Sequence, residues 1–474
     1  MEPDDRGGGA VSGTYHLAVL GDHLGGLAAA ALAARRGQRV LLLETASADT
    51  VRPFDQLNAV TGGPDVDPGL GRLFQELGLA PFGPQGDDRI HFHALSTPLQ
   101  ICLPRHRFSL YADRTARTWE LQREFGDAQR SLPAILQREE ELREKLDRIA
   151  PQSGDANTAL LGRALASVSG FVRLQSLERE TARQGFAAFL GEHDLTPELR
   201  STLVAQAQAI LRRPGAELTW AEGVRALRVA NGGLYRNSAG QDGVLVGLRA
   251  ALISTGGDLR PLVALEGIEV QRTGGARLHL AAGGAVKADR VIIDLPLAEG
   301  LRQIPAEALK ALSRKGLEER QEQSYGLLEL KLAPGRRPVG MGSYLVIAAG
   351  GDDTDAPAVL LAAADEADDG TCALEVLGFF APADTAGARE HLLARVRTII
   401  PFLDESLVGE PVFRTGSAPR YTQERLDRGQ REGRLATGWR TSIFHQPPFT
   451  FLRNEDYASV GLAEGLISGL IALA

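Results

Sequence analysis

The residues best suited to ligand chemistry lie in a glycine-rich turn near the start of the chain. In order, they are Gly21, Asp22, His23, Leu24, Gly25 and Gly26. Glu44 lies 23 positions beyond Gly21. In a dinucleotide-binding turn, the first glycine permits the tight turn, the second admits the pyrophosphate, the third permits helix–strand packing, and the acid holds a ribose hydroxyl. Gly21, Gly26 and Glu44 match three of these roles.

His23 stands where the second glycine is expected. Its Cβ atom and ring would occupy the space in which a pyrophosphate lies against bare backbone. Two interpretations are open: His23 is a neutral replacement in an emptied site, or it makes a new contact to a ligand.

The elements around the turn predict an α/β fold. Residues 16–20 have the apolar pattern of a short buried strand, 24–37 that of an alanine-rich helix, and 39–44 that of a second strand. A strand, turn, helix and strand in about thirty residues form a βαβ unit with parallel strands and a right-handed crossover.

The rest of the chain predicts a discontinuous Rossmann-like domain with a helical insertion and a second, sheet-containing substrate domain. Strand and helix patterns alternate again after a long helical block. The predicted boundaries are 14–105, 227–300 and 431–474 for the three parts of the dinucleotide-binding domain, 106–226 for the helical insertion, and 301–430 for the substrate domain.

Composition excludes several classes of protein. A chain of 474 residues is long enough for two or three domains. The net charge of -8 gives no reason to expect a nucleic-acid partner. Two distant cysteines, an acidic glycine-rich start and apolar runs too short to span a bilayer predict a reduced, cytoplasmic protein.

Other patterns carry less chemistry. His91 and His93 share one face of a predicted strand, but with no third ligand nearby we predict no metal site. No serine-hydrolase elbow, phosphate-binding loop or zinc-protease motif is present. The aromatic segment 444–451 is predicted as a loop that lines an apolar pocket, fills a vacated one, or packs on itself. An apolar stripe within 160–172 favours core packing over contact with a membrane surface.

The order of five segments resembles the phytoene desaturase and flavin-containing amine oxidase superfamily, over nearly the whole chain. The segments are the βαβ unit through Glu44; Thr61-Gly62-Gly63-Pro64 with the helix to Leu79; Gly232-Gly233-Leu234-Tyr235 with the strand carrying Val263 and Ile268; Ala288-Asp289-Arg290-Val291-Ile292-Ile293; and the 435–438 strand with a closing helix that contains Gly465, Ser468 and Gly469.

The resemblance implies a site for FAD. The residues it places at the cofactor are Gly21, His23, Gly25, Gly26, Glu44, Arg52, Val263, Gly438, Trp439 and Gly465. Among them, the backbone of Val263 is expected to clasp adenine. The closing helix is expected to direct its N-terminus at the flavin, where the dipole stabilises negative charge.

Three positions depart from the motifs of that superfamily. His23 replaces the pyrophosphate glycine, Thr50-Val51-Arg52 replaces Gly-Gly-Arg, and Gly438-Trp439 replaces Gly-Asp, whose aspartate takes a ribityl hydroxyl. Three changes around one ligand suggest an eroded or rebuilt FAD site.

Two functions are compatible with these patterns. The resemblance implies an NAD(P)/FAD-dependent oxidoreductase that takes hydride from an apolar or amine small-molecule substrate. The alternative is a flavin-free, degenerate relative that acts as a binding protein or as a partner subunit of an intact paralogue. No catalytic residue is assigned from the sequence.

Overall fold

The computed structural model describes most of the chain. The described residues are 13–45, 55–63, 68–82, 90–97, 99–149, 184–215, 218–271, 274–281, 284–295, 303, 321–348, 357–380, 382–420, 443–446, 448–452, 465–466, 468–469 and 473. The sequence-predicted residues Arg52, Gly438 and Trp439 lie outside them.

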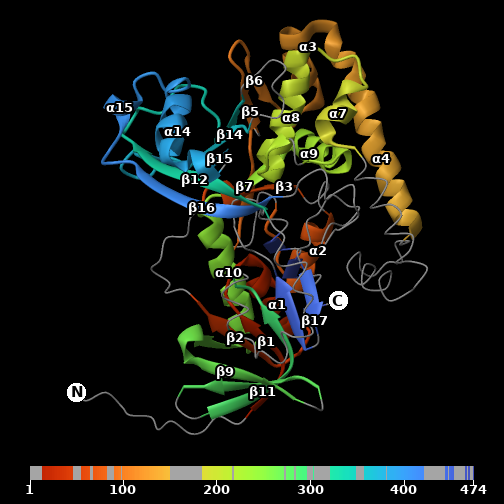
Figure 1. Cartoon of the computed structure of the whole chain (residues 1–474), viewed down its shortest axis with the longest axis vertical. Coiled ribbons are helices and arrows are strands. Elements are labelled where there is room, and N and C mark those ends of the chain that lie inside the picture. Colours follow the sequence, from red (N-terminus) through yellow and green to blue (C-terminus); the bar gives the residue numbers. More distant parts are fainter. Residues whose placement is uncertain are drawn as a thin grey trace.

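An eight-stranded sheet forms the lower half of the molecule in Figure 1. Its strands are β1 (Gly13–Leu20), β2 (Val40–Glu44), β8 (Asp258–Pro261), β9 (Leu265–Val270), β10 (Ala276–Leu280), β11 (Gly284–Ile293), β17 (Ile443–Gln446) and β18 (Phe449–Leu452). The main path runs β17-β18-β11-β1-β2-β8, and β10 and β9 branch from β11. The neighbours β18, β11, β1, β2 and β8 are all parallel. Segments far apart in the sequence therefore form one sheet.

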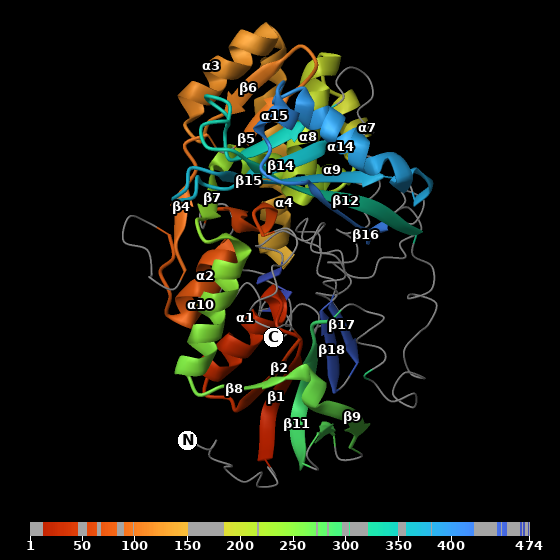
Figure 2. The ribbon, with the colours of Figure 1, turned by 90° about the vertical axis from the view of Figure 1, so that its left-hand side faces the viewer.

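Each face of this sheet is covered by a different layer. On one face lie α1 (Leu24–Arg35), α2 (Pro68–Leu77) and α10 (Gly240–Ser254), as Figure 2 shows. Leu17 and Val19 of β1 pack into the cluster with these helices, whereas Ala18 and Leu20 pack into the cluster with β9 and β10. This alternation follows from the two-residue repeat of a strand. The predicted α/β fold class with a discontinuous sheet is confirmed.

Two predicted elements have a different form in the structure. The single strand predicted from Leu262 to Val270 is divided: the 3-10 helix η4 (Leu262–Ala264) separates β8 from β9. The aromatic segment 444–451, predicted as a loop, contributes to the antiparallel hairpin β17–β18. Phe449 of β18 is buried in the apolar cluster that also contains residues of β9 and β10. The loop prediction was wrong because β18 finds a parallel partner, β11, that is distant in sequence.

A seven-stranded sheet forms the second part of the molecule. Its order is β16-β12-β15-β14-β13-β5-β6. The strands are β5 (Leu99–Cys102), β6 (Arg107–Leu110), β12 (Gln321–Leu332), β13 (Tyr344–Ile347), β14 (Val359–Ala363), β15 (Cys372–Phe380) and β16 (Val412–Arg420). The hairpin β5–β6 spans the predicted boundary at 105, and its strand β5 pairs with β13 of the predicted substrate domain.

Helices cover both faces of the second sheet (Figure 1). One face packs on α14 (Ala388–Arg397), followed by the short α15 (Leu403–Ser406). The other packs on helices of the central segment. The helical elements of this segment are α3 (Arg114–Phe125), η2 (Gly126–Ser131), α4 (Leu132–Ile149), α7 (Phe186–Gly191), α8 (Pro197–Leu211) and α9 (Trp220–Gly232). Among them, α3, α8 and α9 contribute buried residues to the cluster shared with the sheet, whereas α7 packs on α8 and α9.

A small sheet and a 3-10 turn lie where the two parts of the molecule meet. The sheet pairs β3 (Val60–Gly62), β7 (Leu234–Asn237) and β4 (Phe92–Ala94) in the order β3-β7-β4. The turn at the junction, η1 (Leu57–Ala59), precedes β3. A separate 3-10 turn, η5 (Pro382–Gly387), precedes α14. Charged side chains gather both at this junction and at the glycine-rich turn after β1.

Candidate functional site

The turn after β1 has the backbone geometry that its glycine predicts. Gly21 has φ +102°, a left-handed conformation that favours glycine. A Cβ atom at Gly21 would lie 2.0 Å from the backbone oxygen of Asp294. His23 is the N-cap residue of α1, and its side chain makes no capping hydrogen bond. The structure thus places His23 at the helix N-terminus, where its predicted role in ligand contact stays a prediction.

A buried carboxylate binds the first turn of α1. Asp294 follows β11 directly and is 0% exposed. The backbone N–H of Gly26 donates to Asp294 Oδ2 at 2.5 Å. A Cβ atom at Gly26 would lie 2.6 Å from the same oxygen, so only glycine fits without displacing Asp294. A negative charge at this position is stabilised by the helix dipole. No motif in the sequence marks Asp294, although an acidic residue directly after three buried apolar residues is a signal.

Glu44 contacts a cation from a neighbouring helix. The Nε atom of Arg249, on α10, lies 2.7 Å from Oε1 of Glu44. The two side chains form an ion pair, but these two atoms are not oriented for a hydrogen bond. The same guanidinium places Nη2 3.3 Å from Asp22 Oδ2. Asp22 is 0% exposed, and its Oδ1 accepts hydrogen bonds from the N–H and hydroxyl of Thr45 at 3.1 and 2.6 Å. Arg249 is therefore shared by two carboxylates, and no sequence motif marks Arg249 or this role of Asp22.

The other described residues of the predicted cofactor set surround this turn. Val263 lies on η4, immediately after the strand that pairs with Glu44, but its side chain is 89% exposed. A Cβ atom at Gly25 would lie 2.5 Å from Ser468 Oγ and 3.1 Å from the backbone oxygen of Gly465. The helical residues near the C-terminus thus pack directly on the first turn of α1.

A second polar cluster lies at the junction of the two sheets. Glu375, on β15, accepts the backbone N–H groups of Gln56 and Leu57, both at 2.9 Å. Arg236, on β7, is 1% exposed and donates to the backbone oxygen of Ala363 at 2.8 Å. Burial raises the pKa of Glu375 to about 7. Glu375 can therefore exchange a proton near neutral pH, and no motif in the sequence marked it.

His93 lies on β4 near this junction. Its Nδ1 atom is 3.3 Å from the hydroxyl of Ser238, and burial lowers the pKa of the ring. Within the described part of the chain, no group of three His, Cys, Asp or Glu side chains is placed to hold a metal ion.

None of the helices that the structure describes combines the length and the apolar character needed to cross a bilayer.

Comparison with solved structures identifies the fold class. An oxidoreductase from Methanosarcina mazei superposes with a TM-score of 0.57 at 14% identity, covering 96% of this chain and 98% of that one. The likeness extends over both sheets described above, because nearly the whole of each chain is covered. The resemblance to oxidoreductases of this fold is confirmed at the level of structure.

Two amine oxidases share this fold with the chain. A single-residue variant of putrescine oxidase superposes with a TM-score of 0.56 at 15% identity, covering 97% of this chain and 98% of that one. Cyclohexylamine oxidase from Brevibacterium oxydans has a TM-score of 0.50 at 16% identity, covering 97% and 99%. No family model matches the sequence. No curated protein matches it either. The chain therefore has the fold of amine oxidases.

Proposed function

We propose that this chain is a flavin-free protein with an amine oxidase fold, which acts as a binding protein or a partner subunit. The observation that carries the proposal is the Asp22–Arg249–Glu44 cluster, in which Arg249 bridges two carboxylates at the turn predicted to bind a dinucleotide. An intact paralogue of the same fold is the partner that we favour.

Electrostatics support this proposal. A dinucleotide brings a doubly charged pyrophosphate, which needs free N–H donors or cations at the helix N-terminus. Here Asp294 accepts the N–H of Gly26, and Asp22 adds a buried carboxylate beside the turn. Bringing phosphate oxygens close to these carboxylates would cost several kcal/mol in a buried environment. The residues present therefore do not fit the pyrophosphate of FAD.

In the adenosine half of the site, the acid is already paired with a cation. A ribose hydroxyl would have to compete with Arg249 for the carboxylate of Glu44, whose Oε1 lies 2.7 Å from the guanidinium. Arg249, on α10, supplies a basic partner for Glu44 at this turn. The charge on Glu44 is thus compensated without a nucleotide.

A second candidate function is the oxidoreductase with an apolar or amine substrate. Its support is the fold shared with putrescine oxidase and cyclohexylamine oxidase. FAD would supply the hydride-accepting chemistry in that case. His23 in place of the expected glycine and the Asp22–Arg249–Glu44 cluster favour the flavin-free proposal over it.

Cofactor content separates the two candidates. We expect the purified protein to lack the visible absorbance band of flavin and to give no heat on calorimetric titration with FAD. Protein that carries FAD, or that takes it up at a one-to-one ratio, would overturn the proposal in favour of the oxidoreductase.

Titration with adenosine, which has the ribose hydroxyls but lacks the diphosphate disfavoured by Asp22 and Asp294, tests the adenosine half. We expect no binding to the parent and measurable binding to Arg249→Ala, because removal of the guanidinium frees Glu44. The double variant Arg249→Ala, Glu44→Ala should lose that binding again. Arg260→Ala, which removes an arginine from the adjacent strand β8, is the matched control. Adenosine binding to the parent that Glu44→Ala weakens would show instead that the adenosine site is intact.

A further inference from the structure

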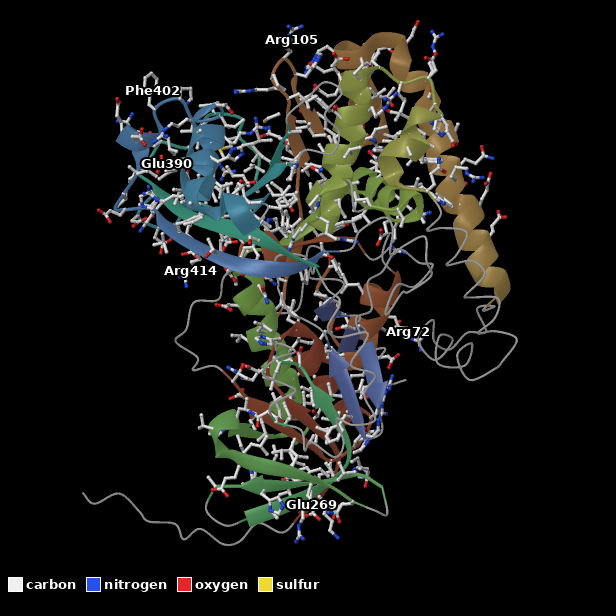
Figure 3. The ribbon with its side chains drawn as sticks, in the orientation of Figure 1. Arg72, Arg105, Glu269, Glu390, Phe402 and Arg414 are labelled. Atoms are coloured by element: carbon white, nitrogen blue, oxygen red, sulfur yellow. The ribbon has the colours of Figure 1, made fainter. Side chains whose placement is uncertain are left out.

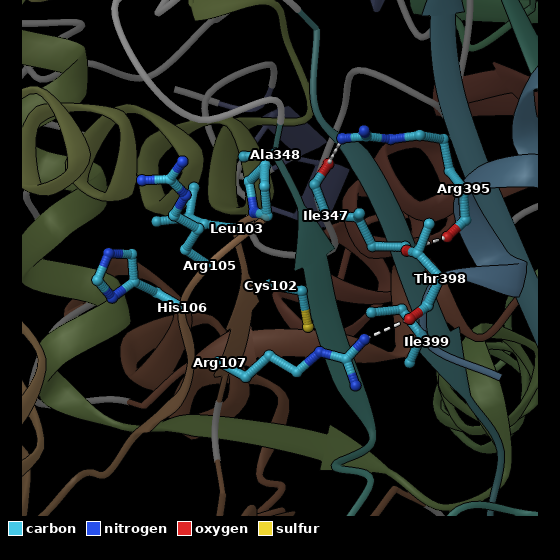
Figure 4. Close-up of a pocket in the computed structure, with 11 residues that line it drawn as sticks. Cys102, Leu103, Arg105, His106, Arg107, Ile347, Ala348, Arg395, Thr398 and Ile399 are labelled. Atoms are coloured by element: carbon cyan, nitrogen blue, oxygen red, sulfur yellow. Dashed lines mark hydrogen bonds between the residues drawn. The ribbon is translucent and has the colours of Figure 1, made fainter. Parts of the chain in front are cut away.

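A cavity of about 570 Å³ lies far from the glycine-rich turn. It opens between the β5–β6 hairpin and the C-terminal end of α14 (Figure 4). Arg105, on this hairpin, and Glu269, on β9, lie at opposite ends of the molecule in Figure 3. The volume is within the range of small-molecule sites. A ligand in this cavity would therefore bind independently of whether FAD occupies the turn.

Three arginines line this cavity. They are Arg105 and Arg107 of the hairpin and Arg395 of α14. None of the described residues that line the cavity is Asp or Glu. His106 also lines it, and its Nδ1 atom lies 3.0 Å from Glu124 of α3, so that carboxylate is already engaged. The cavity wall therefore carries positive charge that its own side chains do not neutralise.

Two of these guanidinium groups are anchored by the backbone. Arg395 Nη2 donates to the backbone oxygen of Ile347 at 3.3 Å. Arg107 Nη2 donates to the backbone oxygen of Thr398. Figure 4 shows the two side chains reaching the cavity from opposite sides. Since a guanidinium has five N–H donors, each retains donors beyond the anchoring bond. Both cations are thus held in position before a ligand arrives.

Most of the remaining wall is apolar, and the exception is Thr398, whose hydroxyl donates to the backbone oxygen of Arg395. Leu103, Ile347 and Ile399 line it, together with the side chain of Cys102. Cys102 is buried, and burial raises the pKa of its thiol, so that it is neutral and apolar near pH 7. A ligand that fits this wall has an apolar body as well as a charged group.

We propose that this cavity binds an organic carboxylate with an apolar body, the carboxylate between Arg107 and Arg395 and the body against Leu103, Ile347 and Ile399. A carboxylate matches the planar fork of arginine, and charge-assisted bonds of this kind are the stronger hydrogen bonds in proteins. The apolar body explains why the site has a hydrophobic floor, which a free inorganic anion would not use.

Decanoate is a suitable probe for calorimetric titration of the full chain. We expect saturable binding at one site and at least about tenfold weaker binding to Arg395→Gln and to Arg107→Gln, because each variant removes a charged hydrogen bond. Decanol, which lacks the charge, and inorganic phosphate, which lacks the apolar body, should both bind more weakly than decanoate. Arg414→Gln, which removes an exposed arginine of β16, is the matched control and should bind like the parent.

Thiol labelling locates the ligand without any substitution. Decanoate should slow modification of Cys102 by a maleimide with the same midpoint as the calorimetric binding. Cys372, a buried thiol outside the cavity, is the internal control and should react at an unchanged rate. Absence of saturable decanoate binding, equal binding by the arginine variants and the parent, or unaltered labelling of Cys102 would each overturn the proposal.

Discussion

Replacing Glu375 with glutamine should change how the stability of the protein depends on pH. Glu375 is 7% exposed and has a pKa of about 7, against an ordinary value of 4.5. Burial is the main cause, Asp55 and Glu329 add repulsion, and the N–H groups of Gln56 and Leu57 partly oppose it. A carboxyl whose pKa is raised on folding favours the folded state at low pH, and this contribution is lost as pH rises through the folded pKa.

The size of this effect follows from the pKa displacement. One pKa unit corresponds to about 1.4 kcal/mol, so the full loss from below pH 4.5 to above pH 7 is about 3 kcal/mol. Between about pH 5 and about pH 8, roughly 2.5 kcal/mol of it is expected. Glutamine is neutral throughout, and its oxygen can still accept from the backbone N–H groups of Gln56 and Leu57. The variant should therefore lack this part of the pH dependence.

Urea unfolding at the two pH values measures the free energies directly. The difference between Glu375→Gln and the parent should shift by about 2.5 kcal/mol in favour of the variant as pH rises from about 5 to about 8. Glu390→Gln, at an exposed position of α14, is the control and should follow the parent. Hydrogen exchange of residues 55–63 gives a local readout. Equal pH dependence in parent and Glu375→Gln would refute the reasoning.

Three further substitutions test the packing of the fold by urea unfolding. Gly26→Val should destabilise the protein by about 3 kcal/mol, with or without FAD, because the added Cβ atom would lie 2.6 Å from a carboxylate oxygen of Asp294. An unchanged unfolding midpoint would show that this contact is absent. Tyr344→Phe should cost about 1 kcal/mol, since the buried hydroxyl donates to a backbone oxygen of α8 at 2.7 Å, and a neutral result would mean that the bond contributes nothing net. Arg213→Met should cost about 3 kcal/mol, because it removes the guanidinium that lies 3.0 Å from the buried carboxylate of Glu222. Adding Glu222→Gln should recover part of that loss. A loss that the second change does not reduce would contradict the ion-pair explanation.

Local patterns were sufficient to predict the elements of the N-terminal unit. The apolar run at 16–20, the glycine turn and the alanine-rich run at 24–37 correspond to β1, the turn at Gly21 and α1 in the structure. These patterns are reliable because a βαβ unit is specified by residues adjacent in sequence. The form of the 262–270 segment was predicted less well, because β8 and β9 have different partner strands, β2 and β10.

The sequence by itself determined the α/β class and the turn that carries Gly21 and Gly26, because these depend on short-range periodicity and on the conformational freedom of glycine. Only the tertiary structure decided the electrostatics of that turn. Asp294 reaches Gly26 across 268 positions of sequence, and Arg249 reaches Asp22 across 227. Charges that meet over such separations leave no periodic pattern in the sequence, since their proximity is produced by the pairing of β11 with β1 and the packing of α10 on α1.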